Sequence, residues 1–196
     1  GKNIYVPYVK ENLALLQYAY DSKTGKVTPL ETKNAKPPLG TGPRHMAYHP
    51  TLPMVYFSNE QGIGLSSYRR EINGELKVAQ DINILPAGMS KIGLSASDLI
   101  ITPDGKFLFA GLRGHSQDFN RISRYRILKD GRAEFIGLTK ADRIPWGLTL
   151  SPDGKFLLVS ATAGASLTAY QISPEGDLMR IKSLPWDPKM SDLVTR

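Results

Sequence analysis

A repeat of about fifty residues is the feature of this sequence that most limits how the chain can fold. Its clearest marker is Pro-Asp-Gly-Lys-Phe-Leu, which occurs at Pro103–Leu108 and again at Pro152–Leu157. His49-Pro50 occupies the same register one repeat earlier, so the successive prolines are 53 and 49 residues apart. A second marker runs in step, because four tyrosines are each followed within several residues by a glycine: Tyr18, Tyr68, Tyr125 and Tyr170.

Apolar runs of strand length follow the turn in each repeat. Pro-Asp-Gly is typical of a tight turn, since proline presets one backbone angle and glycine accepts a positive φ. The run Phe107–Gly111 comes directly after such a turn, and it matches Met54–Ser58 and Phe156–Ser160. These runs are almost wholly apolar, which predicts strands that are buried on both faces.

Two further strands complete the repeat. Ile122–Ile127 alternates apolar and polar residues, which predicts a half-exposed strand, and the turn at Asp130-Gly131 leads to an outer strand near Phe135. The register of the repeat also predicts strand structure within Glu11–Tyr20. Helical periodicity is otherwise absent, so the sequence predicts an all-β protein.

Four-stranded repeats of this length are typical of β-propeller blades, because one such sheet buries its faces only by stacking against neighbours around an axis. We predict about four blades within a single β-propeller domain, at residues 1–38, 39–90, 91–143 and 144–196. Four blades that do not close a ring leave two apolar sheet faces open. We therefore expect missing blades or a partner chain to cover the open ends.

The composition of the chain argues against several classes of partner and cofactor. The chain has 25 Lys and Arg against 18 Asp and Glu, a net charge of +7, but the basic residues are scattered through turns and strands. We therefore expect no nucleic-acid partner. No apolar run reaches the roughly 20 residues of a membrane helix, and we expect no membrane partner. With no Cys and three His, the sequence offers no metal-ligand cluster, and we expect neither a metal nor another cofactor.

Several motifs resemble one known family. Pro43-Arg44-His45 precedes the first apolar run, Asn59-Glu60 ends it, and Arg113-Gly114-His115 ends the run of the next repeat. Together with Ser95–Gly105, they resemble the lactonase family of seven-bladed β-propellers. That family includes bacterial 6-phosphogluconolactonases and the fungal 3-carboxy-cis,cis-muconate lactonizing enzyme. The resemblance implies that this chain corresponds to the later four blades, with about three blades upstream.

The repeat register singles out the same residues. The tenth position after the proline is Glu60 in one repeat, Arg113 in the next and Thr162 in the last. Equivalent positions of successive blades point toward the same zone, so we expect Glu60 and Arg113 to converge, with Arg44 on the connection before its blade. Arg44 and Arg113 would bind the anionic groups of a lactone or carboxylate and stabilise a developing oxyanion. Glu60 would act as general base or acid.

Neighbouring residues carry alternatives. His45 and His115 are candidates for substrate binding, although a histidine in a tight connection is more often a structural group. Asp98 would orient an arginine or tie blades together. A simple ion pair between blades also accounts for Glu60 and Arg113. His49 fills the turn position of Thr102 and Ser151, and the two tryptophans, Trp146 and Trp186, are most simply packing residues.

The function predicted from the resemblance is hydrolysis of a sugar lactone such as 6-phosphogluconolactone, a reaction of carbohydrate metabolism in the pentose phosphate pathway. A carboxymuconate-type lactonizing isomerase would share the same site. A non-catalytic propeller that serves as a binding scaffold is the third interpretation, because one fold hosts many functions. We expect a cytoplasmic location, with the periplasm or secretion as alternatives.

Overall fold

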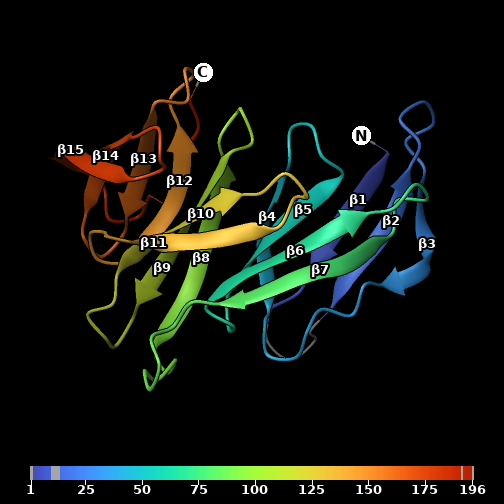
Figure 1. Cartoon of the computed structure of the whole chain (residues 1–196), viewed down its shortest axis with the longest axis horizontal. Coiled ribbons are helices and arrows are strands. Elements are labelled where there is room, and N and C mark those ends of the chain that lie inside the picture. Colours follow the sequence, from blue (N-terminus) through green and yellow to red (C-terminus); the bar gives the residue numbers. More distant parts are fainter. Residues whose placement is uncertain (1, 10–13, 191, 196) are drawn as a thin grey trace.

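The computed structural model describes residues 2–9, 14–190 and 192–195, and every regular element in this part of the chain is a β-strand (Figure 1). The strands form four antiparallel sheets that lie side by side in chain order. The first sheet contains β1 (Asn3–Pro7), β2 (Leu15–Tyr20) and β3 (Val27–Asn34). The second contains β4 (Pro43–Tyr48), β5 (Met54–Asn59), β6 (Gly64–Arg70) and β7 (Leu76–Asn83). The third contains β8 (Leu94–Ile101), β9 (Phe107–Gly114), β10 (Arg121–Ile127) and β11 (Ala133–Lys140). The fourth contains β12 (Pro145–Leu150), β13 (Phe156–Ala161), β14 (Ser166–Ile172) and β15 (Leu178–Pro185).

The all-β prediction is confirmed, and each of the last three sheets has the four strands expected of one repeat. The first sheet has three strands among the described residues, one fewer than the repeat predicts. Within Glu11–Tyr20, residues 15–20 form β2, and residues 11–13 lie outside the described residues. Gly105 and Gly154 close the two Pro-Asp-Gly turns at φ 72° and 69°, the left-handed region that glycine enters at no steric cost.

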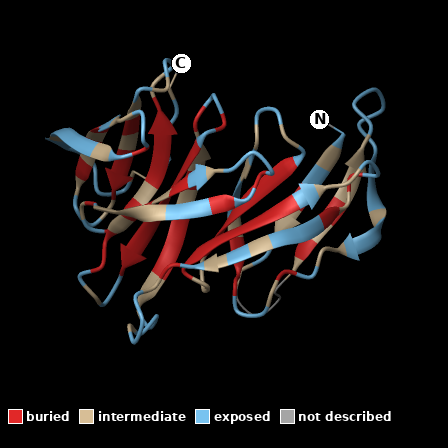
Figure 2. Cartoon of the chain, in the orientation of Figure 1, coloured by how far each residue is buried: buried red, intermediate tan, exposed pale blue. Residues whose placement is uncertain are grey.

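Burial is greatest in the second strands of the second and third sheets (Figure 2). Every residue of β5 and β9 is buried, as the apolar runs predict. In the fourth sheet, Phe156 and Leu158 of β13 are only partly buried, so the predicted burial on both faces is incomplete there.

The prediction of a half-exposed strand at Ile122–Ile127 holds in part. Ile122 and Tyr125 of β10 are buried and Arg126 is exposed, as expected, but the polar Ser123 is buried as well. Neighbouring sheets pack on both sides of β10, so Ser123 is covered.

Hydrophobic clusters fill the spaces between neighbouring sheets. One unites residues of the second and third sheets, and another unites the third and fourth. Tyrosine hydroxyls join the sheets at the repeat's turn glycines: the hydroxyl of Tyr5 donates to Gly74 O at 2.6 Å, and that of Tyr56 donates to Gly131 O at 2.8 Å. The turn glycines therefore sit at the junctions between sheets, where their carbonyls accept hydrogen bonds.

A β-bulge recurs near the start of the first strand in the second, third and fourth sheets. In β4, Arg44 and His45 lie opposite one residue of β5. The same irregularity falls at Ser97-Asp98 of β8 and at Trp146-Gly147 of β12. A bulge re-aims the side chains it carries. Each of these three sheets thus has two residues, at equivalent positions of its first strand, whose side chains the bulge redirects.

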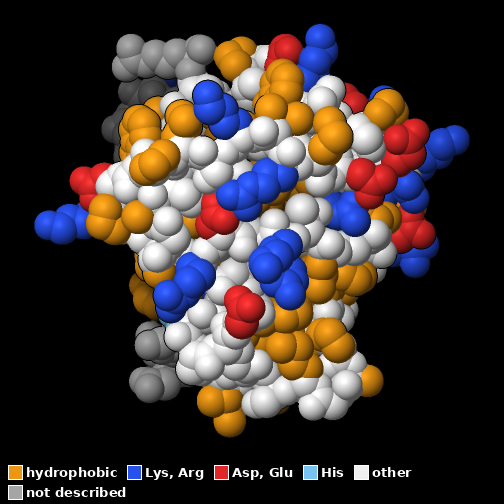
Figure 3. Space-filling model, turned by 90° about the vertical axis from the view of Figure 1, so that its left-hand side faces the viewer, with side chains coloured by type: hydrophobic (Ala, Val, Ile, Leu, Met, Phe, Trp, Pro, Cys, Tyr) orange, Lys and Arg blue, Asp and Glu red, His pale blue; other side chains and the backbone are white. Residues whose placement is uncertain are grey.

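The fourth sheet ends the row, and its outer side carries hydrophobic side chains among Lys and Arg (Figure 3). Met179, Ile181 and Leu184 of β15 are exposed. Apolar side chains at the end of the row fit the expectation that such a face requires a cover. Among the described residues, the chain has no helix that is long and apolar enough to cross a membrane.

Candidate functional site

Glu60 lies between two guanidinium groups that come from two different sheets. Its Oε1 accepts a hydrogen bond from Arg113 Nη2 at 3.1 Å, and its Oε2 lies 3.4 Å from Arg44 Nε. Arg44 lies in the bulge of β4 and not on the connection before its blade, so that part of the prediction is wrong. Glu60 directly follows β5, and Arg113 is near the end of β9. The structure therefore brings together the three residues that the register and the motifs select.

Arg113 is the most deeply buried of the three, with 3 % of its side chain exposed. Its Nε donates to Ser95 Oγ at 2.9 Å, and its Nη2 donates to Ala96 O at 2.9 Å as well as to Glu60. Burial, and then the repulsion of Arg44, lower the pKa of Arg113, while Glu60 opposes this shift. A guanidinium fixed by three acceptors has a defined orientation, which suits recognition of an anion.

Backbone hydrogen bonds hold Glu60 in place. Its N–H donates to Gly42 O at 2.8 Å, and its carbonyl accepts from Ala96 N of the third sheet at 3.2 Å. Gly42 itself has φ 61°, which few other residues adopt. The carboxylate therefore stands on a rigid junction between the second and third sheets.

Trp146 is a member of the site that sequence reasoning missed. Its ring lies 4.4 Å from Arg113 Cζ and 5.6 Å from Arg44 Cζ, so the indole stacks on both guanidiniums. The packing role predicted for Trp146 is therefore incomplete. The repeat register contains the signal, since Trp146 and Arg44 both lie six residues before the repeat's proline. The other tryptophan, Trp186, is 49 % exposed, which contradicts a packing role.

His45 contacts the carboxylate of Asp98 and not that of Glu60. Its Nδ1 lies 2.9 Å from Asp98 Oδ1, across the junction between β4 and β8. Asp98 was expected to orient an arginine or to tie blades together. The second alternative is confirmed, because Asp98 of β8 contacts His45 of β4 and accepts from Leu148 N of β12, and it contacts this histidine rather than an arginine. The imidazole is 43 % exposed, so part of the ring is open to a ligand.

His115 is connected to Arg113 through one hydroxyl. Its Nε2 lies 2.8 Å from Ser95 Oγ, which also accepts from Arg113 Nε. Burial, and then the charge of Arg113, lower the pKa of His115 below its usual value, while Glu60 opposes this shift. Residues of the loop that follows Arg113, among them His115, line a pocket of about 500 Å³ together with Arg143.

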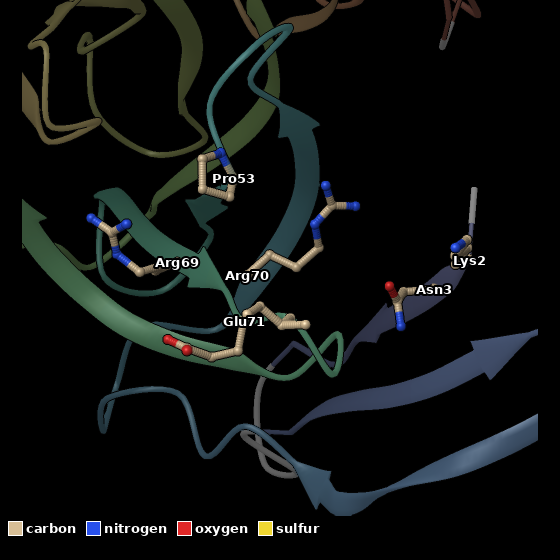
Figure 4. Close-up of a pocket in the computed structure, with 7 residues that line it drawn as sticks. Lys2, Asn3, Pro53, Arg69, Arg70 and Glu71 are labelled. Atoms are coloured by element: carbon tan, nitrogen blue, oxygen red, sulfur yellow. The ribbon is translucent and has the colours of Figure 1, made fainter.

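Two other features lie away from the site. His49 is confirmed as a turn residue, because its Nδ1 accepts from Leu52 N at 3.0 Å. A pocket of about 600 Å³ is lined by residues that include Pro53 and Arg70 (Figure 4). Pro53 precedes β5 and Glu60 follows it, so this pocket and the carboxylate lie at opposite ends of that strand.

The arrangement can bind an anion and stabilise a developing negative charge. Arg44 Nη1 is buried and has no hydrogen-bond partner among the described residues, so the site holds a hydrogen-bond donor that these residues do not satisfy. The stacked indole holds the two like-charged groups without neutralising them. Two guanidiniums beside one carboxylate suit a reaction in which an oxyanion forms and a proton is transferred.

Comparison with known proteins identifies the relatives of this chain. Residues 13–187 match the family described as "Lactonase, 7-bladed beta-propeller". The 6-phosphogluconolactonase of Yersinia enterocolitica is 30% identical over 186 residues, which cover 93% of this chain and 54% of that protein. That of Erwinia tasmaniensis is 30% identical over 182 residues, 92% of this chain and 52% of that protein. The chain thus spans about half the length of the curated relatives it matches.

A solved structure has the same fold. The periplasmic gluconolactonase of Pseudomonas aeruginosa superimposes with a TM-score of 0.85 at 22% identity, covering 96% of this chain and 52% of that one. The four sheets are therefore propeller blades, as the repeat predicts.

Proposed function

Because the chain belongs to the family of seven-bladed β-propeller lactonases, we propose that the full-length protein hydrolyses a sugar lactone such as 6-phosphogluconolactone. The relatives named 6-phosphogluconolactonase support this reaction class. The observation that carries the proposal is the contact of Glu60 with the guanidiniums of both Arg44 and Arg113.

The two arginines bind the substrate in this proposal. Lactone hydrolysis passes through a tetrahedral intermediate whose former carbonyl oxygen is negatively charged. Arg113 is oriented before substrate arrives, and Arg44 offers a buried donor without a partner in the described part of the chain. Donors fixed in advance stabilise such an oxyanion most effectively. His45 and His115 supply further contacts to the anionic substrate.

Glu60 acts as the general base. It accepts a proton from the attacking water, and the two guanidiniums position its carboxylate. No cofactor takes part in this scheme.

The architecture of the whole protein is part of the proposal. The four sheets form part of a single β-propeller domain, and further blades or a partner chain cover its two open ends. The half-length match to the relatives supports further blades. We propose a cytoplasmic location, with the periplasm as the alternative suggested by the Pseudomonas aeruginosa relative.

The test is the rate of opening of 6-phosphogluconolactone by the full-length protein, corrected for spontaneous hydrolysis. Glu60→Gln and Arg113→Met are each expected to lower kcat/KM by about tenfold or more. Glu134→Gln is the matched control, because Glu134 forms an exposed ion pair with Arg126 away from the site. Equal rates for all three variants and the wild type would refute the proposal. Turnover of a carboxymuconate, without opening of sugar lactones, would favour the isomerase instead.

A further inference from the structure

His45 and Asp98 occupy equivalent positions of the recurring bulge in neighbouring sheets. His45 follows Arg44 in the bulge of β4, and Asp98 follows Ser97 in the bulge of β8. The two side chains meet at 2.9 Å between Nδ1 and Oδ1. Since Arg44 of the same bulge contacts Glu60, the pair stands beside the proposed lactone site.

Asp98 is fixed by more than the histidine. Its Oδ1 accepts from Leu99 N at 2.9 Å, and its Oδ2 accepts from Leu148 N of β12 at 2.9 Å. The carboxylate therefore joins the second, third and fourth sheets and cannot rotate freely. The backbone N–H of His45 donates to Ser58 Oγ at 3.2 Å, which holds the histidine as well.

This geometry leaves one ring nitrogen of His45 available. A carboxylate at Nδ1 makes that nitrogen the donor and fixes the orientation of the ring. Nε2 has no hydrogen-bond partner among the described residues, and the ring is partly exposed.

The other two histidines are held differently. His49 places Nε2 3.1 Å from Gly105 O, and His115 places Nε2 2.8 Å from Ser95 Oγ. Within the described part of the chain, His45 alone combines a carboxylate partner with an unoccupied ring nitrogen. This combination is the one that proton-transferring histidines use.

We propose that His45 is the general acid of the lactonase reaction and that Asp98 is its positioning residue, an inference that rests on the proposed function. Water attacks the lactone carbonyl carbon and gives a proton to Glu60. As the bond between that carbon and the ring oxygen breaks, protonated His45 donates its Nε2 proton to the ring oxygen, which becomes the product hydroxyl. The proton held by Glu60 then passes through solvent to His45, which restores both groups.

The experiment replaces His45 by glycine in the full-length protein and adds free imidazole. His45→Gly is expected to lower kcat by about 100-fold, because proton transfer typically contributes 10²–10⁴-fold. Imidazole at tens of millimolar is expected to restore at least tenfold of that loss, measured against the background opening of lactone by imidazole alone. Asp98→Asn is expected to lower kcat without rescue by imidazole, since the ring is present but wrongly held. His49→Gln with the same additive is the matched control and is expected to keep wild-type kcat.

The outcomes separate this inference from the proposed function. An active wild type whose His45→Gly variant keeps its kcat, or loses it without rescue by imidazole, overturns the role of His45 and leaves the lactonase proposal standing. A wild type that opens no sugar lactone refutes the proposed function and the role of His45 with it. Melting temperatures of the variants show whether each remains folded under assay conditions.

Discussion

Replacing Glu60 by glutamine tests whether the two guanidiniums depend on its charge. The substitution keeps the size of the side chain and removes its negative charge. Arg113 keeps its bonds to Ser95 Oγ and Ala96 O, and the amide oxygen can still accept from Nη2. The amide nitrogen, however, must then face Arg44 Nε, which is also a donor.

The expected cost in folding free energy follows from these contacts. A hydrogen bond between charged groups contributes about 1.5–3 kcal/mol. Removal of one partner of a fully buried ion pair costs about 3–5 kcal/mol. Glu60 is 18% exposed and its replacement keeps one hydrogen bond. We therefore expect a cost in the range for a single charged hydrogen bond and below that for a fully buried ion pair, about 2 kcal/mol.

Urea unfolding of the full-length protein measures this cost. With a denaturant slope of roughly 2 kcal/mol per M, the midpoint is expected to fall by about 1 M. Glu134→Gln, in the exposed pair with Arg126, is expected to change the free energy of unfolding by less than about 0.5 kcal/mol. The reasoning is refuted if Glu60→Gln is as stable as that control.

Variants at three further positions, Trp146, Asp142 and Tyr56, test other contacts of the structure. Trp146→Leu removes the indole from Arg113 and Arg44, and we expect KM for the lactone to rise several-fold. Trp146→Phe keeps an aromatic ring there, and we expect its KM to stay close to that of the wild type. Similar KM values for the two variants would contradict the stacking role. Burial acts to raise the pKa of Asp142, but the hydrogen bonds from Arg180, Thr168 and Ser166 outweigh it and lower this pKa to about 2. The stability that the ionised carboxylate contributes is therefore present above about pH 4 and is lost as the pH falls toward 2. Solvent screening reduces this contribution to about 1 kcal/mol, and Asp142→Asn should abolish the corresponding pH dependence in urea titrations between pH 4 and 2. Tyr56→Phe leaves Gly131 O without its donor and is expected to cost about 1 kcal/mol of unfolding free energy, an unchanged value arguing against the tyrosine link between sheets.

Much of the fold can be predicted from the sequence because each repeat encodes its own turns and strands. The apolar runs of β5 and β9 are buried throughout, and the turn glycines adopt positive φ, as expected. The burial of Ser123 in β10 could not be predicted, because the alternation of residue types along one strand does not report which neighbouring sheets cover it.

The site residues that could be predicted from the sequence are those at equivalent positions of the repeat. Glu60 and Arg113 follow from equivalent positions, and the register also pairs Trp146 with Arg44. The contacts that Trp146 and Asp98 make depend on a bulge. A bulge adds one residue opposite a partner strand, and no residue type in this sequence marks it. The bulge decides that Asp98 contacts His45 and not an arginine.

The central claim is that a negatively charged lactone is held between the guanidiniums of Arg44 and Arg113 beside Glu60. A crystal structure of the full-length protein with the reaction product, 6-phosphogluconate, tests it most directly. We predict that the product carboxylate lies within hydrogen-bond distance of at least one of the two guanidiniums, near the ring of Trp146. Binding of the product only in the pocket lined by Lys2 and Arg70, at the other end of β5, would contradict the claim.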